Sequence, residues 1–136
     1  MAGLNIFKNF ATDEKVEENG KEIQIGDTSF ITVAREGNKR YQRMFTKLYE
    51  ASQFVLKQKN DAAEVRAVEI TIEVMAHTIL LGWRGMDAPD DSPDMPYSIE
   101  NAKLLLAVKD FRKMVDGYSK DFANFKAAEE VETAKN

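Results

Sequence analysis

The period of the hydrophobic pattern changes once along the chain, and this change most constrains the fold. Between residues 21 and 34, apolar and polar residues alternate on both sides of Gly26-Asp27. A period of two with a central turn signal predicts a β-hairpin at 21–35. From Asn38 to residue 125, apolar residues recur every three or four positions, which predicts helices. We therefore expect a mainly α, α+β fold: an N-terminal β-hairpin followed by about four helices at 38–125.

Polar capping residues divide the helical part. Asn38 is expected to cap the first helix, and Asp61 begins a capping-box pattern at the second. Ser98 and Asp110 are expected to cap the third and fourth helices, and the segment 82–85 to end the second. A glycine in the middle of the fourth helix, Gly117, costs about 1 kcal/mol relative to Ala. We expect it to permit a close helix crossing.

Length and composition indicate one domain. A chain of 136 residues can bury its own hydrophobic core without disulfides or a metal ion. We expect a flexible N-terminal lead-in at 1–20, a single domain at 21–126 and a disordered acidic tail at 127–136. No apolar run approaches the roughly 18 residues of a transmembrane helix, so no membrane partner is expected.

Residue types that carry catalysis and metal binding are scarce. The chain has no cysteine, which excludes disulfides, zinc–thiolate sites and cysteine nucleophiles. Its single histidine, His77, excludes a His-rich metal site, and a lone His on an apolar helical face is more often a packed core or interface residue. The glycine motifs that bind nucleotides are missing. We expect no enzymatic activity, no catalytic residue, no metal site and no cofactor.

Four aspartates gather in the segment 87–94, which also holds two of the three prolines. Calcium needs several oxygen ligands at fixed spacing, and an EF-hand loop also needs a central Gly and a closing Glu. Neither stands in register here. A solvated acidic loop is therefore the expected reading, and a calcium site the alternative.

Basic residues cluster between Arg35 and Lys47, with Tyr41 and Phe45 interleaved. Such a pattern can grip the phosphates of a nucleic acid. The alternative is that both aromatic residues belong to the core, leaving the cations as a solvated rim or as a docking site for the acidic loop. Because the net charge is −4, we expect no nucleic-acid partner.

Surplus apolar helix surface remains once one core face is assigned. The second helix carries apolar residues on two sides, and the fourth is rich in aromatic residues. Core packing accounts for most of this surface, and the excess predicts self-association or binding of an apolar helical partner. The residues expected on this partner-binding surface are Ile70, Val74, His77, Leu81, Phe122 and Phe125.

The order of several segments resembles the tail assembly chaperones of long-tailed, siphovirus-type bacteriophages. These segments are the strand at 30–35 followed by Asn38 to Tyr41, the helix ending in Leu-Leu-Gly-Trp at 80–83, and the Asp/Pro-rich loop. The segment 96–105 (PYSIENAKLL) resembles the family's Pro-aromatic-Ser-x-x-Asn-Ala-x-x-Leu-Leu pattern, and the Phe-containing helix at 110–125 follows it. The resemblance covers the chain from about Ile6 to Phe125.

The resemblance implies a non-enzymatic role in building the phage tail. Such chaperones bind and solubilise the tape measure protein and bring tail tube subunits to it. They act in the host bacterial cytoplasm and are absent from the mature virion. Many are also made in a longer form by programmed ribosomal frameshifting, and residues 129–136 are where the two forms would diverge.

Two other functions fit the residues. A head–tail or tail completion protein of the virion would share the size and the surplus apolar surface. A small nucleic-acid-binding regulator would use the basic cluster. Self-association of the chaperone into a homo-oligomer is also compatible with the apolar surplus.

Overall fold

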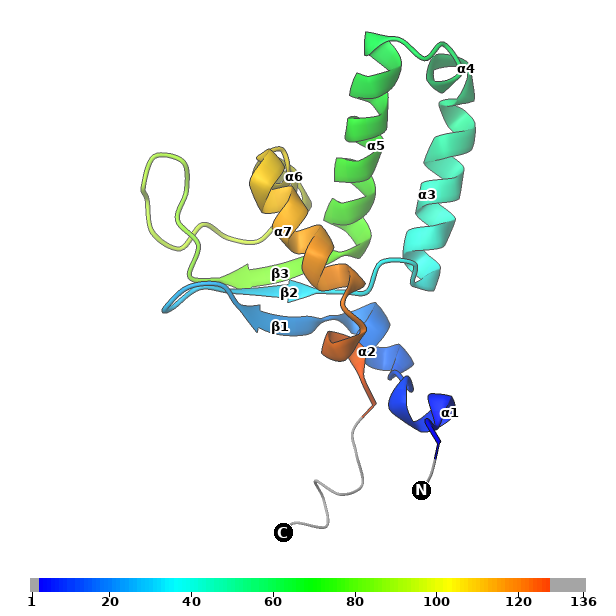
Figure 1. The fold of residues 1–136 in the computed structure, drawn as a ribbon. Coiled ribbons are helices and arrows are strands. Elements are labelled where there is room, and N and C mark those ends of the chain that lie inside the picture. Colours follow the sequence, from blue (N-terminus) through cyan, green and yellow to red (C-terminus); the bar gives the residue numbers. More distant parts are fainter. Residues whose placement is uncertain (1–2, 128–136) are drawn as a thin grey trace.

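A three-stranded antiparallel sheet forms the base of the molecule in the computed structural model, which describes residues 3–127 (Figure 1). Its strands are β1 (Lys21–Gln24), β2 (Phe30–Val33) and β3 (Leu80–Arg84), in the order β1-β2-β3. The first two strands form the predicted hairpin, with Ile23 opposite Ile31. Alternation places Ile31 and Val33 in the core.

The third strand corrects the prediction that a helix continues to Leu81. The helix α5 (Asp61–Thr78) ends two residues before β3, and Leu80 to Arg84 pair with β2 instead. Without this strand, the second edge of β2 would expose unpaired backbone groups. A β-bulge between Thr32 and Val33 adjusts the register, and the Tyr97 hydroxyl donates to the Leu80 carbonyl at 2.9 Å.

The other major helices are α3 (Lys39–Ala51), α4 (Gln53–Leu56), α6 (Ile99–Leu106) and α7 (Lys109–Lys120). Two of the expected caps are confirmed. The Asn38 side chain accepts from the Tyr41 N–H, and the Ser98 hydroxyl accepts from the Asn101 N–H, both at 3.0 Å. The described residues contain seven α-helices rather than about four, partly because Ser52 separates α4 from α3.

Two expected caps are wrong by one or two residues. Asn60, not Asp61, caps α5, because its side chain accepts from the Ala63 N–H at 3.0 Å. Val108 precedes α7 without a side-chain cap, and Asp110 lies in the first turn, where a negative charge still favours the helix dipole. The chain then leaves the α-helix at Asp121 and forms the 3-10 helix η1 (Phe122–Phe125).

The segment 1–20, expected to be a flexible lead-in, contains two short helices in its described part. These are α1 (Ile6–Asn9) and α2 (Glu14–Asn19). The segment is fastened to the domain by a hydrogen bond from the Asp13 N–H to the Phe125 carbonyl at 2.9 Å. Glu17 adds an ion pair with Arg35 at 2.8 Å. Of the tail at 127–136, all but Ala127 lies outside the described residues.

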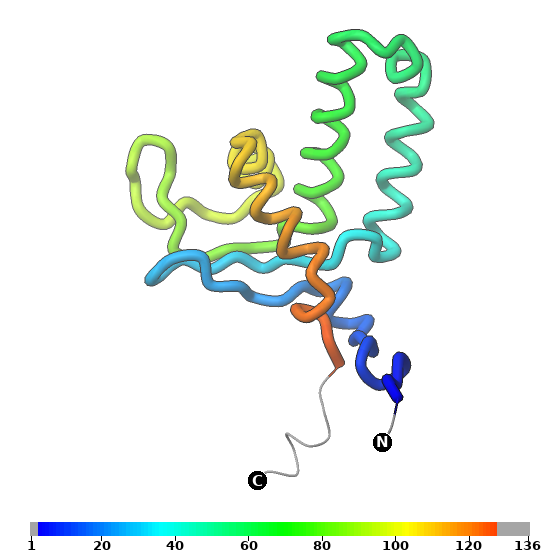
Figure 2. The backbone as a smooth tube through the Cα atoms, viewed as in Figure 1, coloured from blue at the N-terminus to red at the C-terminus, as the bar shows by residue number. Residues whose placement is uncertain are grey.

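The core lies between the sheet and the helices α5, α6 and α7, which cover one face (Figures 1 and 2). Only the C-terminal half of α5 reaches this core. Its N-terminal half leaves the body together with α3 and α4, so that residues 39–78 form a protruding helical hairpin. The buried core cluster consists of Ile31, Val33, Met75, Ala76, Ile79, Leu80, Ala102, Leu106 and Val115.

Candidate partner-binding surface

Three of the six residues expected on a partner-binding surface are buried. Ile70 and Val74 of α5 are 3% and 1% exposed, and Phe125 of η1 is fully buried. On α5 the cause is α3, which packs along the second apolar row of this helix. Leu48 of α3 lines a recess with Ile70, and Phe45 lines another with Val74. These three side chains belong to the interior of the monomer, which corrects the expectation that they face a partner.

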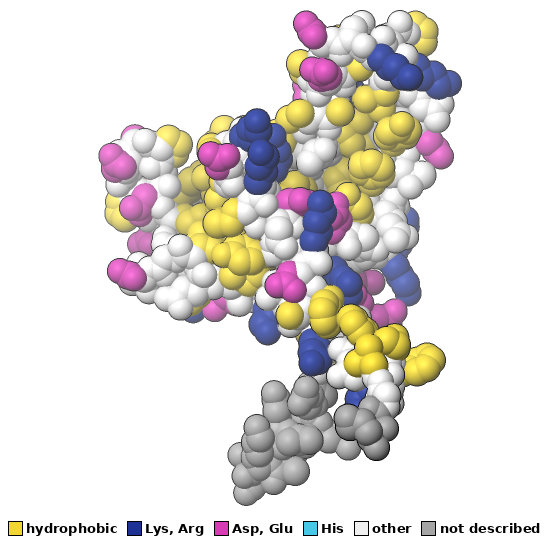
Figure 3. All heavy atoms as spheres, in the orientation of Figure 1, with side chains coloured by type: hydrophobic (Ala, Val, Ile, Leu, Met, Phe, Trp, Pro, Cys, Tyr) yellow, Lys and Arg dark blue, Asp and Glu magenta, His cyan; other side chains and the backbone are white. Residues whose placement is uncertain are grey.

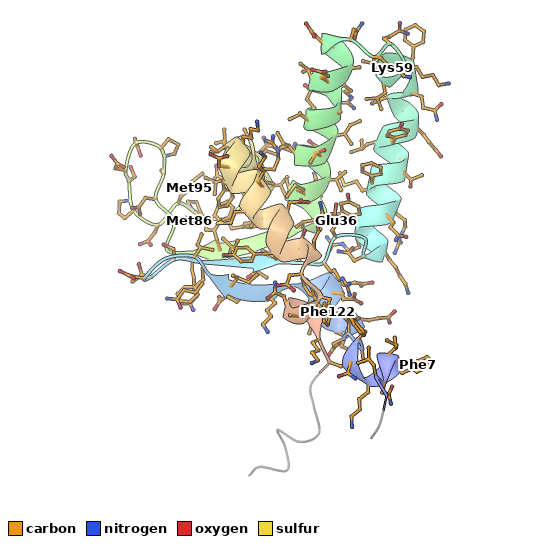
Figure 4. The ribbon with its side chains drawn as sticks, in the orientation of Figure 1. Phe7, Glu36, Lys59, Met86, Met95 and Phe122 are labelled. Atoms are coloured by element: carbon orange, nitrogen blue, oxygen red, sulfur yellow. The ribbon has the colours of Figure 1, made fainter. Side chains whose placement is uncertain are left out.

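The other three expected residues are half-buried and lie apart. His77 is on α5, with its Nε2 atom 3.3 Å from the Glu73 Oε1 atom. Leu81 belongs to β3. Phe122 lies in η1, beside α2 and on the other side of the sheet from α5 (Figure 4), and its ring centroid is 5.2 Å from that of Phe10. The structure therefore does not bring the six residues into one surface.

The largest group of exposed large hydrophobic side chains lies instead on the helical hairpin. On α3, Tyr49 is 47% exposed and Phe45 lies one turn before it. On α5, Val65 and Val68 are exposed. Figure 3 shows hydrophobic side chains gathered over α3 and α5 on the side that faces the viewer. We call the set Tyr41, Phe45, Tyr49, Val65 and Val68 the hairpin face.

Stacked rings give this face a regular aromatic edge. Neighbouring centroids of Tyr41, Phe45 and Tyr49 are 5.8 Å apart, and their planes differ by 9° and 22°. At the base of the row, the Tyr41 hydroxyl donates to Glu36 Oε1 at 3.1 Å. Burial, followed by the negative charge of Glu36, raises the pKa of Tyr41 to about 12. Tyr41 is thus neutral at physiological pH, and its hydrogen bond to Glu36 anchors one end of the row.

The valines of the hairpin face continue a stripe that is buried lower down. Val65 and Val68 follow the same helical spacing as Met75 and Ile79, which lie in the core. Because the hairpin leaves the body, the upper part of this stripe emerges into solvent. On α3, the four-residue spacing of Tyr41, Phe45 and Tyr49 is the sequence signal for the aromatic half of the hairpin face. Spacing alone does not distinguish a buried stripe from an exposed one.

Polar contacts hold the hairpin in place. The Arg66 side chain donates through Nε to the Ser52 hydroxyl at 2.8 Å, which ties α5 to the break between α3 and α4. Lower down, Lys103 of α6 lies 2.8 Å from Glu73 of α5. The hydrogen bond from Lys103 holds the pKa of Glu73 below its usual range. These contacts set the position of α5 relative to α6 and to the break between α3 and α4.

The Asp/Pro-rich loop has its own internal contacts. Its two ends are joined by a hydrogen bond from the Met95 N–H to the Met86 carbonyl at 2.7 Å (Figure 4), and the Trp83 Nε1–H donates to the Met95 carbonyl at 2.8 Å. The Asp90 carboxylate accepts from the Ser92 N–H at 3.0 Å. Within residues 3–127, no group of three or more His, Cys, Asp or Glu side chains is placed to hold a metal ion. None of the described helices is long and apolar enough to cross a membrane.

A comparison with known protein families finds a match over most of the chain. The family described as YdaY prophage protein matches residues 36–136, a stretch that begins just before α3 and includes the whole helical hairpin. No curated protein matches the chain, and no solved structure matches it.

Proposed function

Because the chain belongs to the family of YdaY prophage proteins and so is phage-derived, we propose that it is a tail assembly chaperone. In this role it binds and solubilises the tape measure protein and helps recruit tail tube subunits. It works without catalysis, in the host bacterial cytoplasm, and does not remain in the mature virion. The resemblance of segments 30–35, 80–83 and 96–105 to that group supports the same proposal.

The observation that carries the proposal is the hairpin face. An amphipathic helix binds a protein by laying its apolar stripe against a hydrophobic surface. The stacked rings of Tyr41, Phe45 and Tyr49 run along α3, and Val68 lies on the neighbouring helix. This arrangement offers apolar side chains on two neighbouring helices of the hairpin. A tape measure protein, with its long amphipathic helices, presents the matching kind of stripe.

The charge of the protein suits a solubilising role. The formal net charge of −4 keeps a chaperone–client complex in solution while the apolar surfaces cover one another. Many copies along one long client gain avidity, although each contact is weak. Weak contacts also allow tail tube subunits to displace the chaperone as the tube polymerises.

Co-expression with the tape measure protein of the same phage tests the proposal. The double variant Tyr49→Glu/Val68→Glu places two charges on exposed positions of the hairpin face, so the fold is expected to survive. We expect the soluble fraction of the tape measure protein to fall at least severalfold. Sedimentation of the lysate followed by quantitative immunoblotting measures this fraction.

The matched control is Thr46→Glu/Ala62→Glu, which adds the same charge to exposed positions of the same two helices. This variant is expected to solubilise the client as well as the wild type does. Equal client solubility with both variants would remove the hairpin face from the proposal. Mass spectrometry of purified virions decides the main alternative, because a stoichiometric amount of the chain there would make it a structural completion protein.

A further inference from the structure

A groove lies on the edge of α3 that faces away from the row of Tyr41, Phe45 and Tyr49. Its floor is formed by Met44 and Leu48, and one wall by His77 of α5. Three cations, Arg40, Arg43 and Lys47, stand along its rim. The hollow measures about 510 Å3. We call these six residues the basic groove.

The three cations of the basic groove take no part in the ion pairs of the described residues. Within the described residues, neither Arg43 nor Lys47 forms an ion pair, whereas Arg35 of the same sequence cluster is paired with Glu17. Arg40 is fixed across the groove, because its Nη2 donates to the His77 carbonyl at 3.0 Å. Three unpaired cations beside an apolar floor create a local field that attracts negative groups.

We propose that the basic groove binds an acidic amphipathic helix of a partner protein. The partner's apolar residues lie on Met44 and Leu48, and its carboxylates meet the cations on the rim. Arg40, Arg43 and Lys47 stand at positions i, i+3 and i+7, so they span about 10 Å along one edge of α3. A helix with Glu or Asp at the same spacing matches them charge for charge. This proposal does not rest on the tape measure role, because the hairpin face is a different surface.

The geometry favours a carboxylate-bearing helix over a nucleic acid. Binding of single strands relies on aromatic side chains on which bases stack. Here Tyr41, Phe45 and Tyr49 stack on one another along a different face of α3, where Tyr41 and Phe45 pack toward α5. The protein's own Asp-rich loop is not the occupant within one monomer, because it lies at the far end of the sheet from α3 (Figure 1).

Binding of designed helical peptides to the full chain tests the proposal. One 21-residue peptide carries a Leu stripe flanked by Glu at i, i+3 and i+7, and its counterpart carries Gln at those positions. We expect the Glu peptide to bind the wild type at least tenfold more tightly than the Gln peptide, as measured by fluorescence anisotropy. The variant Arg43→Glu/Lys47→Glu is expected to weaken binding of the Glu peptide at least tenfold and that of the Gln peptide less than threefold.

Two further variants separate charge at the groove from other effects. Lys109→Glu/Lys113→Glu makes the same change in net charge on the exposed surface of α7 and is expected to change binding less than threefold. Arg43→Gln/Lys47→Gln avoids two new carboxylates on α3 and is expected to weaken binding at least threefold, with an unchanged circular dichroism spectrum. Equal affinity for the two peptides, or wild-type affinity in both groove variants, overturns the proposal. The proposal is also overturned if a 20-nucleotide single strand or duplex binds more tightly than the Glu peptide and the groove variants abolish this nucleic-acid binding.

Discussion

At the scale of single residues, two glycines have opposite roles. Gly85 follows β3 with φ of +70°, and a Cβ atom there would collide with the Thr28 carbonyl. Gly117 lies in α7, and no atom beyond its own stretch of helix lies within 4 Å of an added Cβ, so it does not serve the close helix crossing that we expected. Conformational freedom is needed at the first position and wasted at the second.

Replacing each glycine by alanine is therefore expected to change stability in opposite directions. Gly85→Ala should lower the free energy of unfolding by about 1–3 kcal/mol or more, from backbone strain and the clash with Thr28. Gly117→Ala should raise it by roughly 0.5–1 kcal/mol, because helix propensity improves without a clash. Urea denaturation followed by circular dichroism measures both. A loss of stability in Gly117→Ala would mean that this helix surface is in use.

Local polar signals were also readable at this scale. Asn38 and Ser98 cap their helices as expected, because a short polar side chain needs only its own backbone neighbours to do so. The cap of α5 shows the limit of that reasoning, because the residue in this position is Asn60 and not the expected Asp61. Both residue types are good caps. Which of the two adopts the extended backbone conformation depends on the path of the chain between α4 and α5.

At the scale of elements, the ion pair between α5 and α6 makes stability depend on pH. Glu73 has its pKa lowered, chiefly by the hydrogen bond from Lys103 and partly by His77. A carboxyl group with a lower pKa in the folded state contributes stability above its unfolded value of 4.5. That contribution disappears as the pH falls through the folded pKa.

The variant Lys103→Met is expected to reduce the free energy of unfolding at pH 7 by at most about 1 kcal/mol, because the pair is partly exposed. Its difference from the wild type should shrink as the pH is lowered below 4.5. Urea denaturation at pH 7 and pH 3 measures this. Lys113→Met, at an exposed position of α7, is the control and should show no such trend. A pH-independent loss in Lys103→Met would assign its effect to packing of the side-chain stem.

The sequence was informative about β1 and β2 and misleading about β3. A hairpin joins neighbours in sequence, so its alternation and its Gly26-Asp27 turn are visible within fifteen residues. β3 pairs with β2 across about fifty residues, and Leu80 and Leu81 fit the helical spacing of α5 equally well. Only the tertiary pairing decides between the two.

At the scale of the whole molecule, exposure of an apolar stripe depends on how far an element extends beyond the body. Both apolar rows of α5 were visible in the sequence, but the residues that are exposed are not those expected on a partner-binding surface. Ile70 and Val74 are covered by α3, whereas Val65 and Val68 are exposed to solvent because α5 extends beyond the sheet. The sequence therefore indicates that a long helix has surplus apolar surface, but it does not indicate which residues of that surface are exposed.

This architecture predicts unequal local stability along one helix. β2 is paired on both sides, and Met75 and Ala76 of α5 lie in the core. In the upper hairpin, α5 packs against α3 and α4 outside the buried core cluster, so we expect this part to open without unfolding the sheet. Hydrogen exchange followed by mass spectrometry should show amides near Tyr49 and Val65 exchanging roughly tenfold or more faster than those of β2 and residues 74–77. Exchange at one common rate would contradict this prediction, because it would mean that the hairpin and the body unfold together.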